Sequence, residues 1–282
     1  MVGAPAEVFT SVRCLRDASP HGFYGAEELI PDWVAERMSS APQACGAVSQ
    51  HPLAAHVPLW PMHVQRIVDG VHLLARLYPD VWGKHVWDEA SVLASDAVAQ
   101  LLDKLRQMQS SDTEQVRASL RIASNGETRV VLGNMAPASS EIYPVRLDTQ
   151  PTLVDTPYVY VKTDQRSLYD EARARVHGNL GAPGASSSSC FDVLMWHEEA
   201  HACVVTESSI ANVILEIPGA HGQLYTPTCT ALLPGLLLQE LCARGAVTQR
   251  EITVDALHEA LRSGARLWLC NAVRGMFQVA LV

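Results

Sequence analysis

The chain has 282 residues, of which 48% are hydrophobic and 18% are charged, and its formal net charge is −9. This composition is typical of a soluble globular protein with enough apolar residues for one large or two medium domains. The negative charge argues against a surface that binds nucleic acid non-specifically. No apolar run approaches the about 18 residues that a membrane span needs, and the first residues lack the pattern of a secretory signal. The seven cysteines are scattered without a C-x-x-C pair, which favours reduced thiols in a cytoplasmic protein.

The N-terminal half predicts both strands and helices. The stretch AEVFTSVRC favours a strand, and MHVQRIVDGVHLLARLY repeats apolar residues at helical spacing. In chain order we expect a strand over 6–14, helices over 62–78 and 87–108, and a β-hairpin over 116–134. Asn125 and Gly126 are expected to supply two residues with positive φ in the hairpin turn.

The C-terminal half also alternates between the two periodicities. We expect strands over 143–147, 156–161, 191–196, 202–207, 212–217, 266–270 and 276–282, and helices over 167–176, 235–245 and 253–264. Residues 178–190 are rich in glycine and serine and are expected to form a surface loop. The stretch MAPASSE is the expected linker. The fold class is therefore α/β, with an N-terminal domain over 1–134, a linker over 135–141 and a C-terminal domain over 142–282.

Lys162 is the first candidate for chemistry. Of the 21 lysines and arginines, only Lys84, Lys104 and Lys162 are lysines, and Lys162 follows a strongly β-forming run over 158–161. An apolar setting lowers the pKa of a lysine from about 10.4, and the neutral amine can then attack a carbonyl. The alternative is a solvated lysine at the end of a strand.

Two further stretches are candidates for binding the polar groups of a cofactor. Pro234 and Gly235 lead into a helix, so the backbone N–H groups of Leu236 and Leu237 could bind a phosphate without a basic side chain. Glu207 lies among apolar and small residues, where an unpaired carboxylate is costly, and it could pair with a protonated ring nitrogen. The alternatives are an ordinary helix start and a carboxylate that faces water.

Several motifs occur in the order found in one enzyme family. They are KTDQRSLYDEARAR, FDVLMW, VVTESSIANVILE, LYTP, LLPGLLLQELCARG, REIT and LWLCNAVRGM. Together they resemble the class IV (fold type IV) pyridoxal phosphate enzymes, and more narrowly the 4-amino-4-deoxychorismate lyases. The resemblance covers residues 156–282 densely and extends to FTSVR and HVQRIVDG in the N-terminal half. It implies the two-domain fold of D-amino-acid aminotransferases, with the cofactor in the interdomain cleft, and a homodimer.

The resemblance gives several residues a role. Lys162 matches the lysine that binds pyridoxal phosphate covalently, and Glu207 matches the partner of its pyridine nitrogen. His63 and Arg66 match an H-x-x-R-L helix start, whose arginine binds the phosphate. The remaining matches are the phosphate-binding backbone at Leu236 and Leu237, a second phosphate-facing turn at Asn271 and Ala272, and Arg274, which is expected to face substrate carboxylates or a dimer partner.

The chain departs from the family pattern at the helix start. The family usually has threonine and arginine after the glycine of LLPG, whereas this chain has three leucines, Leu236 to Leu238. Binding through backbone N–H groups survives this change, but a side-chain contact is lost. Ser208 also stands where glycine is common. The proline-rich segment before His63 falls where the fold contributes to the substrate pocket, so the resemblance supports the cofactor better than the substrate.

The sequence HEEAH at residues 197–201 matches a zinc motif. On a helix, His197 and His201 would share one face as zinc ligands, with Glu198 as the base. The flanking stretches are β-rich, so we expect a polar hairpin turn and no metal site here. A zinc metallohydrolase that uses these three residues is the outside alternative.

The sequence therefore predicts a 4-amino-4-deoxychorismate lyase that depends on pyridoxal phosphate and releases 4-aminobenzoate and pyruvate for folate biosynthesis. Lys162 is expected to act as the general base while Glu207 keeps the pyridine nitrogen protonated. A class IV transaminase of the branched-chain, D-amino-acid or amine type is the main alternative, because it uses the same two residues. A non-catalytic homologue is a further possibility, given the leucines at the helix start.

Overall fold

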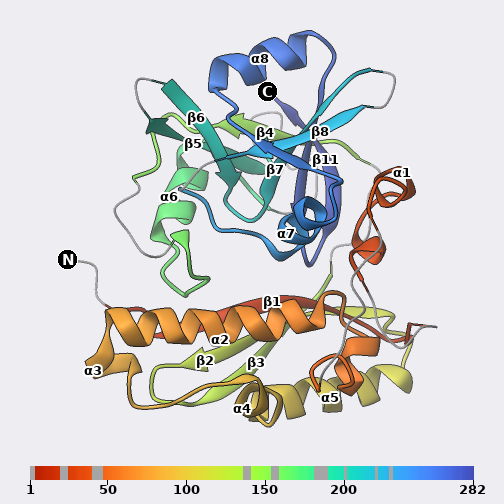
Figure 1. The fold of residues 1–282 in the computed structure, drawn as a ribbon, viewed down its shortest axis with the longest axis vertical. Coiled ribbons are helices and arrows are strands. Elements are labelled where there is room, and N and C mark those ends of the chain that lie inside the picture. The colour runs from red at the N-terminus through yellow and green to blue at the C-terminus, as the bar shows by residue number, and fades with distance from the viewer. Residues whose placement is uncertain are drawn as a thin grey trace. The chain divides into compact units, whose positions relative to one another are not determined.

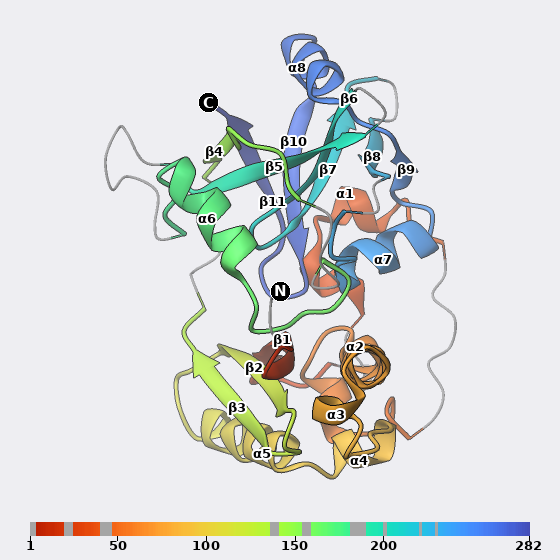
Figure 2. The same ribbon diagram turned by 90° about the vertical axis from the view of Figure 1, so that its left-hand side faces the viewer.

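The structure is a computed structural model that describes residues 4–19, 25–39, 47–135, 141–153, 159–180, 190–199, 202–219, 222–228 and 231–282. The chain forms two compact units (Figures 1 and 2). The first contains Met1–Leu29, Pro42–Met135 and Val161–Gln165, and the second contains Ile30–Ala41, Ala136–Tyr160 and Arg166–Val282. Residues 136–140 of the expected linker and 181–189 of the expected surface loop lie outside the described residues.

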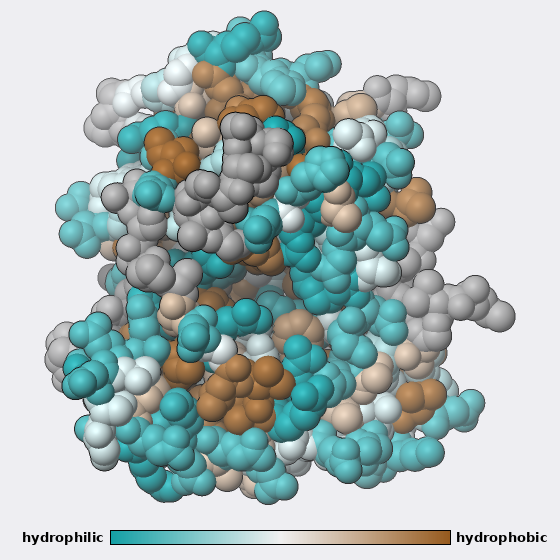
Figure 3. Space-filling view, turned by 180° about the vertical axis from the view of Figure 1, so that it is seen from behind, coloured by the Kyte–Doolittle hydropathy of each residue, from teal (hydrophilic) through white to brown (hydrophobic). Residues whose placement is uncertain are grey.

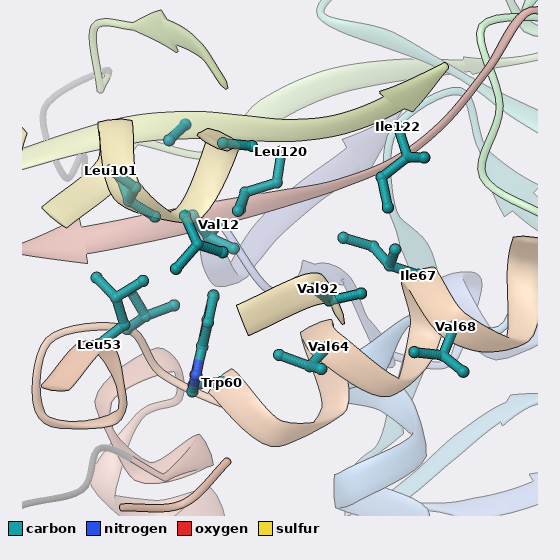
Figure 4. Packing of buried hydrophobic residues seen from close by; sticks show 14 of the residues in the cluster. Val12, Leu53, Trp60, Val64, Ile67, Val68, Val92, Leu101, Leu120 and Ile122 are labelled. Carbon is teal, nitrogen blue, oxygen red and sulfur yellow. The ribbon is translucent and has the colours of Figure 1, made fainter. Parts of the chain in front are cut away.

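The first unit is a three-stranded antiparallel sheet with helices packed on it. Its strands are β1 (Glu7–Leu15), β2 (Gln115–Ala123) and β3 (Thr128–Gly133), in the order β1-β2-β3. Its helices are η1 (Ala26–Leu29), η2 (Pro52–Ala55), α2 (Trp60–Leu77), α3 (Pro79–Trp82), α4 (Glu89–Leu93) and α5 (Asp96–Gln109). Ile67 of α2 and Ile122 of β2 point toward one another in the core (Figure 4). The expected first strand, first helix and hairpin are thereby confirmed.

Two local predictions in this unit are wrong. The helix expected over 87–108 is two helices, because Ser95 has an extended backbone and its hydroxyl accepts a hydrogen bond from Val98 N–H at 3.4 Å, which caps α5. In the β2–β3 turn, Gly126 has φ 87°, but Asn125 is not among the described residues with positive φ. Gly126 N–H donates to Ala123 O at 2.9 Å, so a standard turn followed by one left-handed glycine closes the hairpin.

The second unit is a mixed sheet that closes on itself. The strands are β4 (Tyr143–Leu147), β5 (Asp192–Glu199), β6 (Ala202–Ser208), β7 (Asn212–Ile217), β8 (Gln223–Pro227), β9 (Thr248–Arg250), β10 (Arg266–Asn271) and β11 (Gly275–Leu281). Their order is β10-β11-β4-β5-β6-β7-β8-β9, and β10 also pairs with β7. The helices are α1 (Asp32–Ala35), α6 (Ser167–Arg175), α7 (Leu236–Ala243) and α8 (Val254–Arg262).

Most of the elements expected after residue 141 are confirmed, with three differences. The short strands β8 and β9 were not predicted. The strand expected over 156–161 is absent from its described part, where residues 159–161 form turns and bends. Val161 is 5% exposed and belongs to the core of the first unit, whereas Val159 is buried in the second unit and Tyr160 is 49% exposed. The residues of this run therefore have separate environments and do not share the face of a sheet. Residues 154–158 lie outside the described residues.

Two apolar clusters of the second unit fix the elements around its site. Tyr143, Phe191 and Phe277 form an aromatic group with ring centroids 4.6 to 5.9 Å apart. Tyr169 and Ala172 of α6 pack with residues of β5 in a separate buried cluster, and Figure 2 shows α6 beside β5. This packing holds one face of α6 against the sheet.

The surface agrees with the composition. Most of the face in Figure 3 is hydrophilic, and its apolar residues lie in separate patches. Among the helices that the structure describes, none has the length and apolar character needed to cross a membrane.

Candidate active site

Lys162 lies in an irregular segment of the first unit that runs beside β1. Phe9 N–H donates a hydrogen bond to Lys162 O at 2.9 Å, and Asp164 N–H donates to Glu7 O at 3.2 Å. Between these bonds, Val8 and Thr163 form an isolated β-bridge. The backbone on both sides of Lys162 is therefore fixed to β1.

Gly70 of α2 allows this segment to pack closely. A Cβ atom at Gly70 would lie 2.9 Å from Val8 Cγ1 and 3.1 Å from Val161 Cγ1, both of which are too close for an ordinary contact. The helix, β1 and the residue before Lys162 thus meet at a position where only a hydrogen atom fits. Glycine normally weakens a helix relative to alanine. Its presence here is explained by the close packing of Val8 and Val161.

Lys162 and Arg66 act electrostatically on the same buried imidazole. His63 is 1% exposed, and its Nδ1 lies 2.7 Å from the hydroxyl of Thr10 on β1. Burial, followed by the charges of Arg66 and Lys162, holds the pKa of His63 well below its ordinary value of 6.5. The imidazole is therefore neutral, and the positive charges of Arg66 and Lys162 both act on this part of the first unit, which favours an anionic group.

The ammonium group of Lys162 also lies over an aromatic ring. Its Nζ is 5.3 Å from the ring centroid of Phe9, within the range of a cation–π contact. Phe9 is 5% exposed, so the amine lies against a buried aromatic ring of β1.

Glu207 lies near the end of β6 in the second unit and is 5% exposed. Its Oε1 accepts hydrogen bonds from the Tyr169 hydroxyl at 3.0 Å and from Leu233 N–H at 2.9 Å. Its Oε2 accepts a longer bond from the Asn212 amide at 3.4 Å. Three donors around one buried side chain favour an ionised carboxylate, which has only acceptor atoms. The alternative of a carboxylate that faces water is therefore wrong.

Tyr169 of α6 keeps its proton in this arrangement. Burial, and then the carboxylate of Glu207, raise the pKa of the Tyr169 hydroxyl above its ordinary value of 10.0. The hydroxyl therefore donates and Glu207 accepts.

The turn after Glu207 is held by α6 and β5. Arg166 donates a hydrogen bond to Ser209 O at 2.7 Å, and Arg173 donates to the Ser209 hydroxyl at 3.1 Å. That hydroxyl in turn donates to Asp192 Oδ1 at 2.5 Å. Burial of the Asp192 carboxyl, which is the largest effect on it, raises its pKa above the ordinary value of 3.8. These contacts fix the turn that connects Glu207 to Asn212.

The start of α7 has the geometry expected of an anion site. The helix begins at Leu236 after Gly235, and within the described residues no side chain caps it. The first N–H groups of an α-helix have no partner inside the helix, and Leu236 and Leu237 are 4% and 0% exposed. The helix dipole and these N–H groups would stabilise a phosphate.

The second predicted phosphate turn lies between β10 and β11. Asn271 Oδ1 accepts hydrogen bonds from Val273 N–H at 2.9 Å and Arg274 N–H at 2.7 Å, so this side chain stabilises its own turn. Ala272 is 8% exposed. The guanidinium of Arg274 lies over the Phe191 ring, 5.2 Å from its centroid.

The zinc motif does not lie on a helix in its described part. His197, Glu198 and Glu199 belong to β5 and pair with Val204, Cys203 and Ala202 of β6. Successive side chains of a strand point to opposite faces, so His197 and Glu198 do not share one. His201 lies outside the described residues. The polar turn expected over 197–201 is shorter than predicted, since the strand continues to Glu199.

The donor set fits pyridoxal phosphate. Glu207 has a buried carboxylate that could accept from a ring N–H, and the start of α7 has backbone N–H groups that could bind a phosphate. In the first unit, Lys162 carries the primary amine that an aldehyde requires, and Arg66 carries a positive charge. Each polar part of the cofactor has a complementary group in the chain.

Two residues of this arrangement were not predicted from the sequence. Tyr169 donates to Glu207, and Asn212 contacts both Glu207 and Leu233. A tyrosine inside an apolar helix face needs a hydrogen-bond partner, so the tyrosine of SLYDEARAR was a usable signal. For Asn212, the short turn between β6 and β7 was the available signal, because it predicts that Asn212 pairs with Glu207.

Comparisons with solved structures show the fold. A "Putative amino-acid aminotransferase" from Mesorhizobium loti is 19% identical, with a TM-score of 0.64 over 98% of this chain and 99% of that chain. A "Putative 4-amino-4-deoxychorismate lyase" from Legionella pneumophila is 14% identical, with a TM-score of 0.58 over 98% of this chain and 83% of that one. A "hypothetical aminotransferase" from Mycobacterium tuberculosis in its PLP-bound form is 12% identical, with a TM-score of 0.57 over 100% and 85%.

The family follows from the sequence itself. No curated protein matches the chain. The model of the family described as amino-transferase class IV matches residues 53–282, which include Lys162, Glu207 and the start of α7. The chain therefore belongs to the class IV aminotransferase family of enzymes that depend on pyridoxal phosphate.

Proposed function

We propose that this chain is a 4-amino-4-deoxychorismate lyase. The substrate loses its enolpyruvyl group as pyruvate, and its ring becomes the aromatic ring of 4-aminobenzoate. Pyridoxal phosphate, when bound, supplies an electron sink for the carbon beside the substrate nitrogen. The formation of an aromatic ring favours the products.

Each predicted residue has a defined task in this proposal. Lys162 holds the cofactor and then accepts the proton from the ring carbon that carries the amino group. Glu207 accepts a hydrogen bond from the protonated pyridine nitrogen. The first N–H groups of α7, with Leu236 and Leu237, bind the phosphate, and Arg66 adds positive charge. Asn271 and Ala272 form the second phosphate-facing turn, and Arg274 is assigned to the substrate carboxylates.

The ordered motifs over residues 156–282 carry the choice of a lyase. Together they resemble the lyases of the family, and Arg274 in NAVRG matches the lyase-like pattern. Two of the similar structures also carry the name "Putative 4-amino-4-deoxychorismate lyase". We further propose that the chain acts as a homodimer in the cytoplasm, and light scattering tests the dimer.

A class IV transaminase is the second candidate. Similar structures include a fold IV transaminase from Curtobacterium pusillum and several branched-chain amino acid aminotransferases. Such an enzyme would use Lys162 and Glu207 in the same way and would differ in its second substrate.

A product assay tests the proposed function. The purified protein with pyridoxal phosphate is incubated with 4-amino-4-deoxychorismate, and 4-aminobenzoate and pyruvate are measured over time. We expect equal amounts of both products and none with Lys162→Ala. Transfer of an amino group from branched-chain or D-amino acids to a 2-oxo acid, without these products, would identify a transaminase and contradict the proposal.

A further inference from the structure

Asn212 is buried where three strands of the second unit meet. It is the first residue of β7, it pairs with Glu207 of β6, and it pairs with Cys270 of β10. Its exposed fraction is 3%. A polar side chain at such a place must be satisfied by protein groups, so its partners show what it does.

The Asn212 amide joins Glu207 to the loop that leads into α7. Its Nδ2 donates to Leu233 O at 2.9 Å and, over a longer distance of 3.4 Å, to Glu207 Oε2. Leu233 N–H donates back to Glu207 Oε1 at 2.9 Å. The carboxylate, the amide and the Leu233 peptide thus form a small closed network.

The other end of the Asn212 amide touches the helix start itself. A Cβ atom at Gly235, the residue before α7, would overlap Asn212 Oδ1 and would lie 3.2 Å from Asn212 Cγ. Gly235 has φ −68° and ψ 138°, a conformation that any residue adopts. Glycine is therefore required for the space that Asn212 occupies, and not for its backbone conformation.

We propose that Asn212 is a positioning residue that couples Glu207 to the N-terminus of α7. The inference rests on the proposed roles of Glu207 at the pyridine nitrogen and of α7 at the phosphate. These two groups bind the ring nitrogen and the phosphate of the same cofactor molecule, so their separation must match the distance between those two groups. Asn212 contacts both and holds that separation.

The first test compares two ligands. Dissociation constants are measured for pyridoxal phosphate and for pyridoxal, which lacks the phosphate, by titration followed by absorbance. We expect Asn212→Ala to reduce the ratio of the two constants, which measures the phosphate contribution, about ten-fold. Thr226→Val is the matched control, because it removes a buried hydrogen bond, from Thr226 Oγ1 to Val213 O at 2.8 Å, in the same sheet. This control should keep the wild-type ratio.

The second test uses the contact with Gly235. Gly235→Ala should weaken the binding of pyridoxal phosphate about ten-fold in the wild-type background, because the new methyl group displaces the Asn212 amide. In the Asn212→Ala background the amide is gone, and the same substitution should change binding less than two-fold. Such non-additivity is the signature of direct coupling.

The outcomes separate the inference from the proposed function. A wild-type protein that binds no pyridoxal phosphate overturns both. A wild-type protein that binds the cofactor while Asn212→Ala leaves the ratio unchanged, or weakens both ligands equally, overturns the inference alone. Equal effects of Gly235→Ala in the two backgrounds also overturn it.

Discussion

His63 of the first unit is buried within the electrostatic reach of two positive side chains that are only half-buried. Its imidazole lies beside Thr10 and is fully enclosed, and the charges of Arg66 and Lys162 both oppose its protonation. A neutral imidazole lets Lys162 and Arg66 approach the same region without adding a third charge. The arrangement would be stabilised by the phosphate of the cofactor.

The depressed pKa of His63 makes stability depend on pH. The unfolded chain binds a proton near pH 6.5 and the folded protein does not, so stability falls as the pH drops below this value. Between about pH 6.5 and about pH 5.5 this residue should cost about 1 kcal/mol of the free energy of unfolding.

Urea unfolding at these two pH values measures the effect. His63→Gln should lose this part of the pH dependence, whereas His258→Gln, on the exposed side of α8, should retain the wild-type slope. Equal slopes for wild type and His63→Gln would show that His63 is not held neutral in the folded protein.

At the scale of single residues, the sequence identified charged groups better than their partners. Lys162 and Glu207 stood out because a rare lysine and a carboxylate among apolar residues are unusual wherever they occur. Tyr169 and Asn212 did not, because their importance depends on which atoms of Glu207 and Leu233 they reach. Such contacts depend on strand register and helix docking, which composition does not reveal.

At the scale of elements, Gly70 links α2 to the segment that carries Lys162. Alanine normally stabilises a helix relative to glycine by up to about 1 kcal/mol. At this position its Cβ would press on Val8 and Val161, and β-branched side chains have little rotamer freedom to move away. Close packing should therefore outweigh helix propensity.

Gly70→Ala should lower the free energy of unfolding by about 1 to 3 kcal/mol, as overpacking of a core does. Gly133→Ala is the matched control, since a Cβ there has no described atom within 4 Å. Adding Val161→Ala to Gly70→Ala should cost less than the sum of the single changes, because it makes room for the methyl group. If Gly70→Ala were as stable as the control, close packing would not explain this glycine.

Some helices and strands could be predicted from the sequence and others could not. The helix at α2 has a clear periodicity, and β6 and β7 are short runs rich in β-branched residues; all three were predicted correctly. The split between α4 and α5 depends on the cap by Ser95. In the run before Lys162, Val161 enters the core of the first unit without belonging to a strand. A continuous apolar run records burial without specifying a strand.

At the scale of the whole molecule, two compact units carry different parts of the proposed chemistry. Lys162 and Arg66 belong to the first, although Lys162 follows the expected linker in the sequence, and Glu207 and α7 belong to the second. The α/β class was predictable because many segments each contributed a weak signal of the same kind. The membership of residues 161–165 was not, since it rests on a few hydrogen bonds to β1.

The identity of the cofactor lysine is the most direct test. The protein is incubated with pyridoxal phosphate, reduced with borohydride to fix the covalent bond, digested, and mapped by mass spectrometry. With only Lys84, Lys104 and Lys162 in the chain, the result is unambiguous. We expect the added mass on Lys162, in near stoichiometric yield. Modification of Lys84 or Lys104 in its place, or no modification at saturating cofactor, would contradict the role given to Lys162 and the mechanism built on it.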